Sequence, residues 1–245
     1  MKINKIKKYM SLVVVTLFIL QGNSAVYAER LLPIYSVHRQ DKCVALTFDC
    51  AWGAEDMEEI LEILDRQKVK ASFFVVGDWV RAYPEVAKAI VKGGHDIGNH
   101  SDKHPHVTEM TKEEIKKDIR LAHQSIKQMT GIDAVLYRPP YGEYNNTVIE
   151  AAKECDYETI QWNVDSLDWK EYGRQALIDK VLKHKNLVPG TIVLLHNGTD
   201  YTKDALEELI CGLKTKGYTI IPVSQMLIQD DYYLDHEGRQ YKVET

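Results

Sequence analysis

The sequence predicts a single α/β domain in which parallel strands alternate with helices. From Cys43 onward, short apolar runs alternate with amphipathic segments, which is the order expected of consecutive βαβ units. The chain has 245 residues, 44% hydrophobic and 27% charged, enough for one globular domain with a substantial core. About seven strands and a similar number of helices fit either a closed or partly closed barrel or an open doubly wound sheet.

Each predicted element rests on its hydrophobic period and its boundary residues. The strands are short apolar runs at residues 44–48, 71–76, 95–98, 135–137, 159–164, 191–195 and 218–221. The helices show apolar residues three and four apart, and they cover residues 54–67, 83–92, 111–129, 146–155, 174–184 and 205–216. Gly93 ends the second helix; the third has Thr108 and Thr111 as candidate N-caps and is followed by Gly131.

The N-terminal residues 1–28 are typical of a signal peptide. Four lysines precede an apolar stretch of eleven residues, 10–20, and small residues allow cleavage after Ala28. The alternative is an uncleaved membrane anchor, but eleven residues fall well short of the roughly 20 that span a bilayer. We therefore expect an exported protein with no stable membrane span after cleavage.

The rest of the chain divides into a linker or edge segment (29–40), the α/β domain (41–228) and a polar tail (229–245). Removing residues 1–28 removes four lysines and no acid, so the net charge moves from −5 to −9. An acidic protein without a basic run is not expected to bind nucleic acid. Most of the four cysteines are expected to be buried free thiols, although three complete disulfide pairings remain open.

Unusual polar residues follow five of the predicted strands. They are Asp49, the pair His100 and His104, Arg138, the pair Asp165 and Asp168, and His196. In a parallel barrel the carboxyl ends of the strands surround one mouth, where catalytic groups collect. Five strands with this feature indicate one catalytic site.

Two of these segments suggest particular chemistry. His100 and His104 are four residues apart, so on a helical turn they could bind one metal ion. The segment Arg138-Pro139-Pro140-Tyr141-Gly142 is a rigid turn that could hold an arginine beside a carboxylate and aim backbone N–H groups at a developing oxyanion. The alternatives are that the two histidines are unrelated surface residues and that the turn is an ordinary loop.

The ordered motifs TFD (47–49), HSDKH (100–104), RPPYG (138–142), DSLDW (165–169) and LLH (194–196) resemble those of a known family. This family is the polysaccharide deacetylases of carbohydrate esterase family 4, which share the NodB homology domain. The likeness spans residues 41–228. The TFD-x-x-WG variant at residues 47–53 and the signal segment are most similar to sporulation-type peptidoglycan deacetylases.

The resemblance implies a distorted (β/α) barrel and metal-assisted removal of N-acetyl groups from glycan N-acetylhexosamines. It makes Asp49 the general base, Arg138 the residue that orients it, and His196 the acid that protonates the leaving amine. Asp168, in preference to Asp165, would support His196. The chemistry agrees, because amide hydrolysis needs an activated water, a stabilised oxyanion and a protonated leaving group.

The resemblance also implies how substrate and metal are held. His100 and His104 would be metal ligands, and the backbone N–H of Tyr141 would help to hold the oxyanion. Trp52, Tyr141 and Trp169 are candidate platforms for sugar rings. The metal is expected to be divalent, with zinc first and cobalt or manganese as alternatives.

Cys50 departs from the family pattern, which has a metal-binding aspartate at this position. Cys50 could be a thiolate ligand of a softer site that favours zinc. It could instead face the core while the histidines, Asp49 and water hold the metal, or the site could be metal-poor and nearly inactive. Alternation along a strand favours the core, because neighbouring residues point to opposite faces.

The expected function is that of an exported, monomeric hydrolase acting on peptidoglycan, located outside the cell or in the wall or spore envelope. A catalytically impaired glycan-binding homologue is the main alternative, and chitin or acetylated xylan are alternative substrates. The acidic charge gives no attraction to an anionic wall, so affinity would come from sugar stacking and hydrogen bonds.

Overall fold

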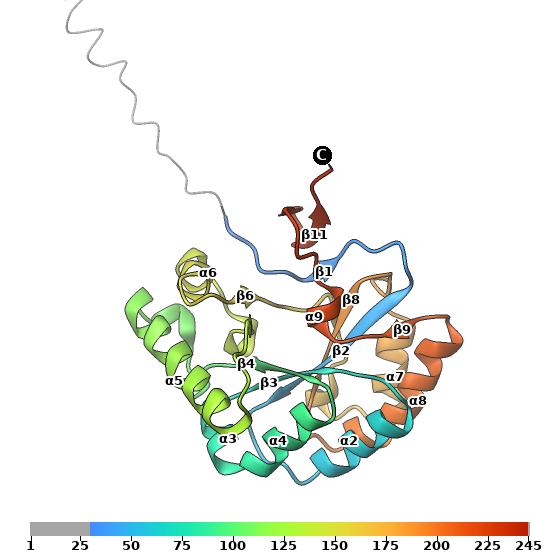
Figure 1. The fold of residues 1–245 in the computed structure, drawn as a ribbon. Helices are drawn as coiled ribbons and strands as arrows, with labels where there is room; N and C mark the ends of the chain where they lie inside the picture. Colours follow the sequence, from blue (N-terminus) through green and yellow to red (C-terminus); the bar gives the residue numbers. More distant parts are fainter. Residues whose placement is uncertain (1–29, 245) are drawn as a thin grey trace, which may run out of the picture. The chain divides into compact units, whose positions relative to one another are not determined.

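A curved, mostly parallel sheet forms the centre of the fold, and helices lie along its outer side (Figure 1). The computed structural model describes residues 30–244, and from Leu31 onward the chain forms one compact unit. The predicted signal segment, 1–28, lies outside the described residues. No helix within residues 30–244 combines the length and apolar character needed to cross a membrane.

The sheet runs in the order β10-β11-β1-β8-β2-β3-β4-β5-β6, with β7 paired to β8 and β9 paired to β2. All pairs among β2 to β9 are parallel; the antiparallel pairs are β1 with β8 and β10 with β11. The strand bounds are β1 Ser36–Val37, β2 Cys43–Cys50, β3 Ser72–Val75, β4 Asp96–Asn99, β5 Leu136–Tyr137, β6 Glu158–Thr159, β7 Val164–Asp165, β8 Thr191–His196, β9 Thr219–Ile220, β10 Tyr232–Leu234 and β11 Arg239–Lys242. The expected α/β fold and distorted barrel are confirmed, as an open, curled sheet.

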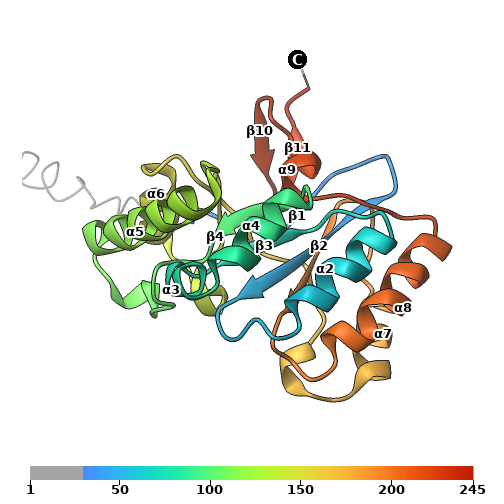
Figure 2. The same ribbon diagram turned by 60° about the horizontal axis from the view of Figure 1, so that its bottom comes forward.

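The helices agree with the predicted segments to within a few residues, and two short ones, α3 and α9, are additional. Their bounds are α2 Met57–Arg66, α3 Gly77–Ala82, α4 Pro84–Lys92, α5 Lys112–Thr130, α6 Asn146–Lys153, α7 Arg174–Leu182, α8 Thr202–Thr215 and α9 Val223–Met226. Helix α5 begins at a capping box formed by Thr111 and Glu114 and ends at the left-handed Gly131, so Thr111 rather than Thr108 is the N-cap. Figure 2 shows α2, α4, α7 and α8 outside the strands.

The two faces of the central strand β2 contribute to two different cores. Val44, Leu46, Phe48 and Cys50 belong to the large cluster between the sheet and the helices. Cys43 and Ala45 belong to a smaller cluster on the inner side of the curved sheet. All eight residues of β2 are buried, because a parallel strand covered on both faces is enclosed by side chains from both layers.

Two features differ from the sequence-based expectation, both in short strands. The single strand predicted at 159–164 is two strands, β6 and β7, which pair with β5 and β8 respectively. The predicted polar tail contains the hairpin β10–β11. The predicted linker or edge segment contains β1, which pairs with both β11 and β8. Strands of two to four residues are too short to show a clear hydrophobic period.

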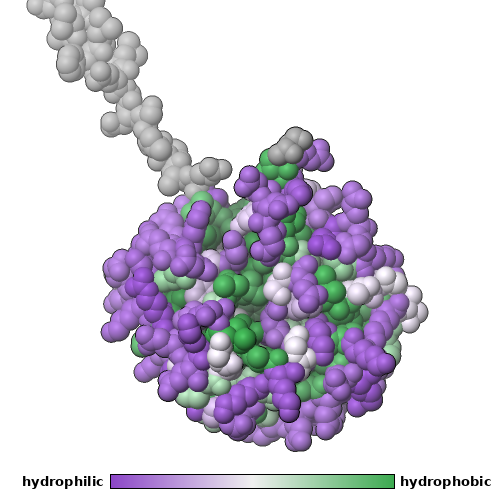
Figure 3. Space-filling model, viewed as in Figure 1, coloured by the Kyte–Doolittle hydropathy of each residue, from purple (hydrophilic) through white to green (hydrophobic). Residues whose placement is uncertain are grey.

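The surface seen in the orientation of Figure 1 is hydrophilic around its periphery, whereas hydrophobic residues gather nearer its middle (Figure 3). All four cysteines are free thiols; Cys43 and Cys50 are buried, Cys155 is half-buried and Cys211 is exposed. The cysteines are free thiols as expected, but only two of the four are buried, fewer than the sequence predicted.

Candidate active site

Asp49 and His196 lie directly opposite each other on neighbouring parallel strands. In the register of β2 and β8, Asp49 is the partner of His196 at the carboxyl end of both strands. Asp49 is 7% exposed, and the His196 side chain is 25% exposed. Parallel pairing therefore places a carboxylate and an imidazole side by side at the end of the sheet where catalytic groups collect.

Arg138 holds Asp49 in a buried ion pair. Arg138 Nη1 donates to Asp49 Oδ1 at 2.7 Å and to Thr47 Oγ1 at 2.9 Å, and Nη2 donates to the carbonyl oxygen of Gln161 at 3.1 Å. The guanidinium carbon lies 4.0 Å from the centre of the Phe74 ring. A buried charge pair needs such additional partners because both ions have lost their hydration.

The net effect on Asp49 is a carboxylate that stays ionised. Burial by itself would raise the pKa of Asp49, but the positive charge of Arg138, together with His100 and His196, holds it below the usual value. Asp49 Oδ2 is 3.6 Å from His100 Nε2, so this oxygen faces the histidines rather than the arginine.

His196 and Asp168 form a second buried pair. His196 Nδ1 is 2.8 Å from Asp168 Oδ1, and the His196 backbone N–H donates to Asp168 Oδ2 at 2.6 Å. The Thr202 hydroxyl also donates to Oδ2, at 2.8 Å. Burial opposes charge on His196, but the hydrogen bond to Asp168 and the negative charges of Asp168, Asp49 and Asp165 together outweigh burial and raise the pKa of His196 above the ordinary value. The imidazole is therefore suited to give up a proton from Nε2.

Asp165 forms no hydrogen bond or ion pair with His196. Its Oδ1 accepts from the backbone N–H of Leu167 at 2.8 Å and closes a local turn. Leu167 has a left-handed conformation, with φ of 56°. This turn reverses the direction of the chain between the two acids, so Asp168 alone lies against the histidine.

His100 and His104 lie beside Asp49 on the loop after β4. His100 is 2% exposed, and its Nδ1 is 2.7 Å from the carbonyl oxygen of Arg138, which leaves Nε2 directed at Asp49. The His100 and His104 ring centres are 4.9 Å apart. Burial lowers the pKa of both, that of His104 to about 4, so both rings are neutral at pH 7 and keep a nitrogen lone pair.

The loop that carries these two histidines is fixed by buried hydrogen bonds. Asn99 Oδ1 accepts from the Ser101 backbone N–H at 2.8 Å, and the Ser101 hydroxyl accepts from the His104 backbone N–H at 2.8 Å. Ser101 and His104 both have left-handed backbone conformations, with φ of 73° and 57°. Such conformations cost free energy and persist where the surroundings impose them, often at functional sites.

These groups face one cavity of about 350 Å³. It is lined by Asp49, Ala51, Trp52, His100, His104, Tyr141, Gly142, Trp162, Trp169, Leu194 and His196. Trp52, Tyr141 and Trp169 at its rim are 68%, 54% and 49% exposed. Exposed aromatic rings around a polar centre are suited to the apolar faces of sugar rings.

Tyr141 is the most strained of the rim residues. It has φ of 58°, which is rare for a bulky side chain, within the turn Pro140–Gly142. Its ring stacks on His106, with centres 4.4 Å apart, and meets His104 edge-on at 4.5 Å. The turn therefore fixes both the ring and the backbone of Tyr141 at the cavity.

A family model for polysaccharide deacetylases matches residues 36–160, about half of the chain. The chain belongs to the polysaccharide deacetylase family. The peptidoglycan-N-acetylmuramic acid deacetylase PdaA of Bacillus subtilis is 30% identical over 84% of this chain and 79% of its own length. The uncharacterized protein YlxY of the same organism is 36% identical over 84% of this chain, which spans 65% of YlxY.

The solved structures that resemble this polysaccharide deacetylase include one without activity. Wild-type BA3943, a CE4 family pseudoenzyme from Bacillus anthracis, has a TM-score of 0.77 and 35% identity, covering 81% of this chain and 69% of its own. A mutant of BA3943 with restored enzymatic activity gives the same TM-score at 36% identity, with 81% and 72% coverage. Family membership and activity are thus separate questions.

Deacetylases of this family generally use a divalent metal. His100 and His104 have the donor chemistry for one: His100 is oriented through Nδ1, and His104 Nδ1 is buried without a hydrogen-bond partner within residues 30–244. Across the part of the chain that the structure describes, however, no three His, Cys, Asp or Glu side chains are grouped to hold a metal ion. The three-side-chain site that the resemblance implies does not fit this chain.

Cys50 is the reason for this misfit. It is fully buried in the cluster between sheet and helices, does not line the cavity, and has Phe48 O, at 3.9 Å, as its polar partner. Burial raises the pKa of its thiol well above the usual value. Of the three alternatives for Cys50, the structure agrees with the core position and not with the tentative one of a thiolate ligand, because alternation along β2 turns the side chain away from Asp49.

Sequence inspection missed several groups that support the site. Thr47 and Gln161 bind the guanidinium of Arg138, Thr202 binds Asp168, and Asn197 Nδ2 holds the turn after β2 through the carbonyl oxygens of Trp52 and Gly53. Thr47 could have been found, because it is two residues before Asp49 and shares its face of the strand. The others bind through backbone carbonyls or from distant helices, which leaves no sequence pattern.

Proposed function

We propose that this chain is an exported hydrolase that removes N-acetyl groups from the N-acetylhexosamines of peptidoglycan. The observation that carries the proposal is the pair of Asp49 and His196, which lie side by side at one cavity and are each held by a buried partner. Hydrolysis of an amide needs a base to activate water and an acid to protonate the leaving nitrogen, and this pair supplies both.

Asp49 is the proposed base. Its pKa lies below the usual value, so it is ionised at neutral pH and can accept a proton from a water molecule as that water attacks the acetyl carbon. Arg138 keeps Oδ1 fixed at 2.7 Å, so Oδ2 is the oxygen that is available to the water. Such a fixed base contributes roughly 10²–10⁴-fold to the rate.

His196 is the proposed acid. Collapse of the tetrahedral intermediate breaks the carbon–nitrogen bond, and the sugar nitrogen must take up a proton to leave as an amine. Asp168 raises the pKa of His196, so the protonated ring is available near neutral pH with Nε2 toward the cavity. The products are acetate and the free amino sugar.

The turn at Tyr141 is the proposed oxyanion and sugar site. Its strained backbone brings an N–H group to the cavity wall, where a donor would stabilise the negative charge on the former carbonyl oxygen. The exposed rings of Trp52, Tyr141 and Trp169 would pack against sugar faces.

A divalent metal, zinc or in its place cobalt or manganese, would be held by His100 and His104, with water completing its shell. We expect weak binding, because Cys50 does not supply a further ligand.

A second candidate function is glycan binding without turnover. The core position of Cys50 favours it, as does the similarity to a CE4 pseudoenzyme. The intact pairs Arg138–Asp49 and Asp168–His196 argue against it, since a binding protein has no need for a positioned base and acid.

Acetate release separates the two functions. The purified protein, supplied with zinc, cobalt or manganese, should release acetate from peptidoglycan or its oligosaccharides, and Asp49→Asn should abolish the release while glycan binding persists. Chitin oligomers and acetylated xylan test the alternative substrates. Glycan binding with no acetate from any substrate would establish the second function and exclude the first.

A further inference from the structure

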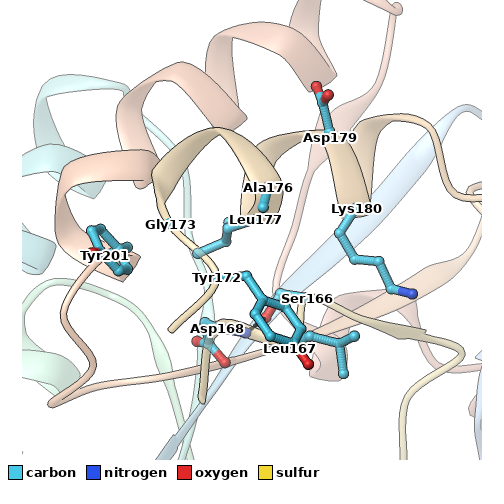
Figure 4. Close-up of a pocket in the computed structure, with 10 residues that line it drawn as sticks. All are labelled: Ser166, Leu167, Asp168, Tyr172, Gly173, Ala176, Leu177, Asp179, Lys180 and Tyr201. Atoms are coloured by element: carbon cyan, nitrogen blue, oxygen red, sulfur yellow. Dashed lines mark hydrogen bonds between the residues drawn. The ribbon is translucent and has the colours of Figure 1, made fainter. Parts of the chain in front are cut away.

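A second cavity, of about 420 Å³, adjoins the candidate active site on the far side of one loop. It is formed by the segment after β7, one side of α7 and the residue before α8, with Leu167, Asp168, Tyr172, Leu177, Lys180 and Tyr201 among its walls (Figure 4). Asp168 lines this cavity, whereas its neighbour Trp169 lines the active-site cavity. A chain-like substrate that passes over Trp169 would reach both.

Three side chains of this second cavity lack partners in the described part of the chain. The side chains of Tyr172, Tyr201 and Lys180 make no hydrogen bond or ion pair with another described residue. Asp179, by contrast, is bound by Lys183 Nζ at 2.7 Å and by Gln175 Nε2 at 3.0 Å, and its carboxylate points away from Tyr172 and Lys180 (Figure 4). Asp168, the other acid of this cavity, is bound by His196 and Thr202, so Lys180 forms an ion pair with neither acid.

The chemistry of these walls defines a class of ligand. Tyr172 is 68% exposed and lies beside Leu167 in Figure 4, so its ring and the apolar side chains offer a surface for the face of a sugar. Lys180 offers a cation for a carboxylate. The volume falls within the range of roughly 300–1,000 Å³ that is typical of small-molecule sites.

We propose that this cavity binds a carboxylate-bearing sugar of the glycan next to the N-acetyl sugar that is deacetylated. The inference rests on the proposed deacetylase function and narrows its substrate class. A glycan with acidic sugars, such as one containing N-acetylmuramic acid, satisfies Lys180, whereas a neutral glycan such as chitin leaves this cation without a partner.

The test is a binding measurement on the full chain with Asp49→Asn, which prevents turnover. The probes are a peptide-free tetrasaccharide of alternating N-acetylglucosamine and N-acetylmuramic acid, and the neutral tetramer of N-acetylglucosamine. Lys180→Gln should weaken binding of the acidic tetrasaccharide about tenfold, as expected for one hydrogen bond to a charged group, and should leave the neutral tetramer unaffected. Lys180→Arg should retain most of the affinity.

Lys183→Gln is the matched control. It removes one positive charge three residues after Lys180, but Lys183 lies outside the cavity and is paired with Asp179. It should change neither affinity. Equal effects of Lys180→Gln on both probes, no effect on either, or failure of the acidic tetrasaccharide to bind would overturn the inference.

The binding readout separates this inference from the proposed function. If no glycan releases acetate but Lys180 still decides binding of the acidic probe, the proposed function fails and the site stands. If acetate is released while Lys180→Gln binds the acidic probe normally, the proposed sugar site is rejected and the proposed function stands.

Discussion

The position of Cys50 in the core leads to a specific prediction for Cys50→Asp, the change that restores the residue usual in the family. Cys50 has no exposed surface and lies in the apolar cluster that includes Met57, Ile60 and Trp79. A carboxylate there would have no cation or N–H donor to replace its hydration. We therefore expect the change to destabilise the fold rather than to complete a metal site.

The magnitude follows from the environment. Burial already raises the pKa of the Cys50 thiol well above its usual value, and full burial raises the pKa of carboxyl groups by up to about 3–5 units. Each unit corresponds to about 1.4 kcal/mol, so the penalty at pH 8 is about 4–6 kcal/mol. The carboxyl group introduced by the substitution then holds its proton more tightly in the folded state than in the unfolded state. The penalty is thus absent below about pH 4 and grows as the pH rises toward the folded pKa.

Urea unfolding of Cys50→Asp beside Cys50→Ala, at pH 5 and pH 8, measures this penalty. The alanine variant lacks the thiol but adds no titrating group, so the difference between the two variants should widen by about 3 kcal/mol at the higher pH. Metal analysis of both should show no gain in bound divalent ion. Equal stability at both pH values, with a newly bound equivalent of metal in Cys50→Asp, would refute the core placement.

Three further changes test the supporting network. Asp168→Asn should lower the pKa of His196, shift the alkaline limb of the pH–rate profile to lower pH and reduce kcat. Asp165→Asn should shift that limb less, because Asp165 acts on His196 through its charge alone; identical profiles would contradict the assigned pair. Arg138→Met should reduce acetate release and destabilise the protein by about 3–5 kcal/mol in chemical denaturation, because it leaves Asp49 buried without its counter-ion. A fully stable variant would argue against the buried pair. Asn99→Ala should lower the free energy of unfolding by about 1–3 kcal/mol in the same assay. It should also raise the metal concentration needed for activity, because it releases the loop that carries His100 and His104. Unchanged metal dependence would show that other contacts hold the loop.

Local sequence signals predicted the central elements because each signal belongs to the element itself. The apolar run before Asp49 and the capping residues Thr111 and Gly131 mark boundaries that tertiary contacts then preserve. The hairpin β10–β11 has no such signal, because its strands have only three and four residues. Its position in the sheet is set by the pairing of β11 with β1, near the other end of the chain.

The site shows the same division. The motifs identified Asp49, Arg138 and His196 as strand-end residues, but not which atoms meet. The preference for Asp168 over Asp165 as the partner of His196 was decided by the left-handed turn at Leu167, and the supporting hydroxyl of Thr202 comes from helix α8.

The sequence by itself determined the order of the elements and the polar residues at the strand ends, because these depend on neighbours within a few positions. The resemblance implied that Arg138 orients Asp49, but only the tertiary structure decided the pairing of Asp49 with His196, the atoms through which Arg138 binds Asp49 and the core position of Cys50. These depend on the register and curvature of the sheet, which bring together residues far apart in the chain.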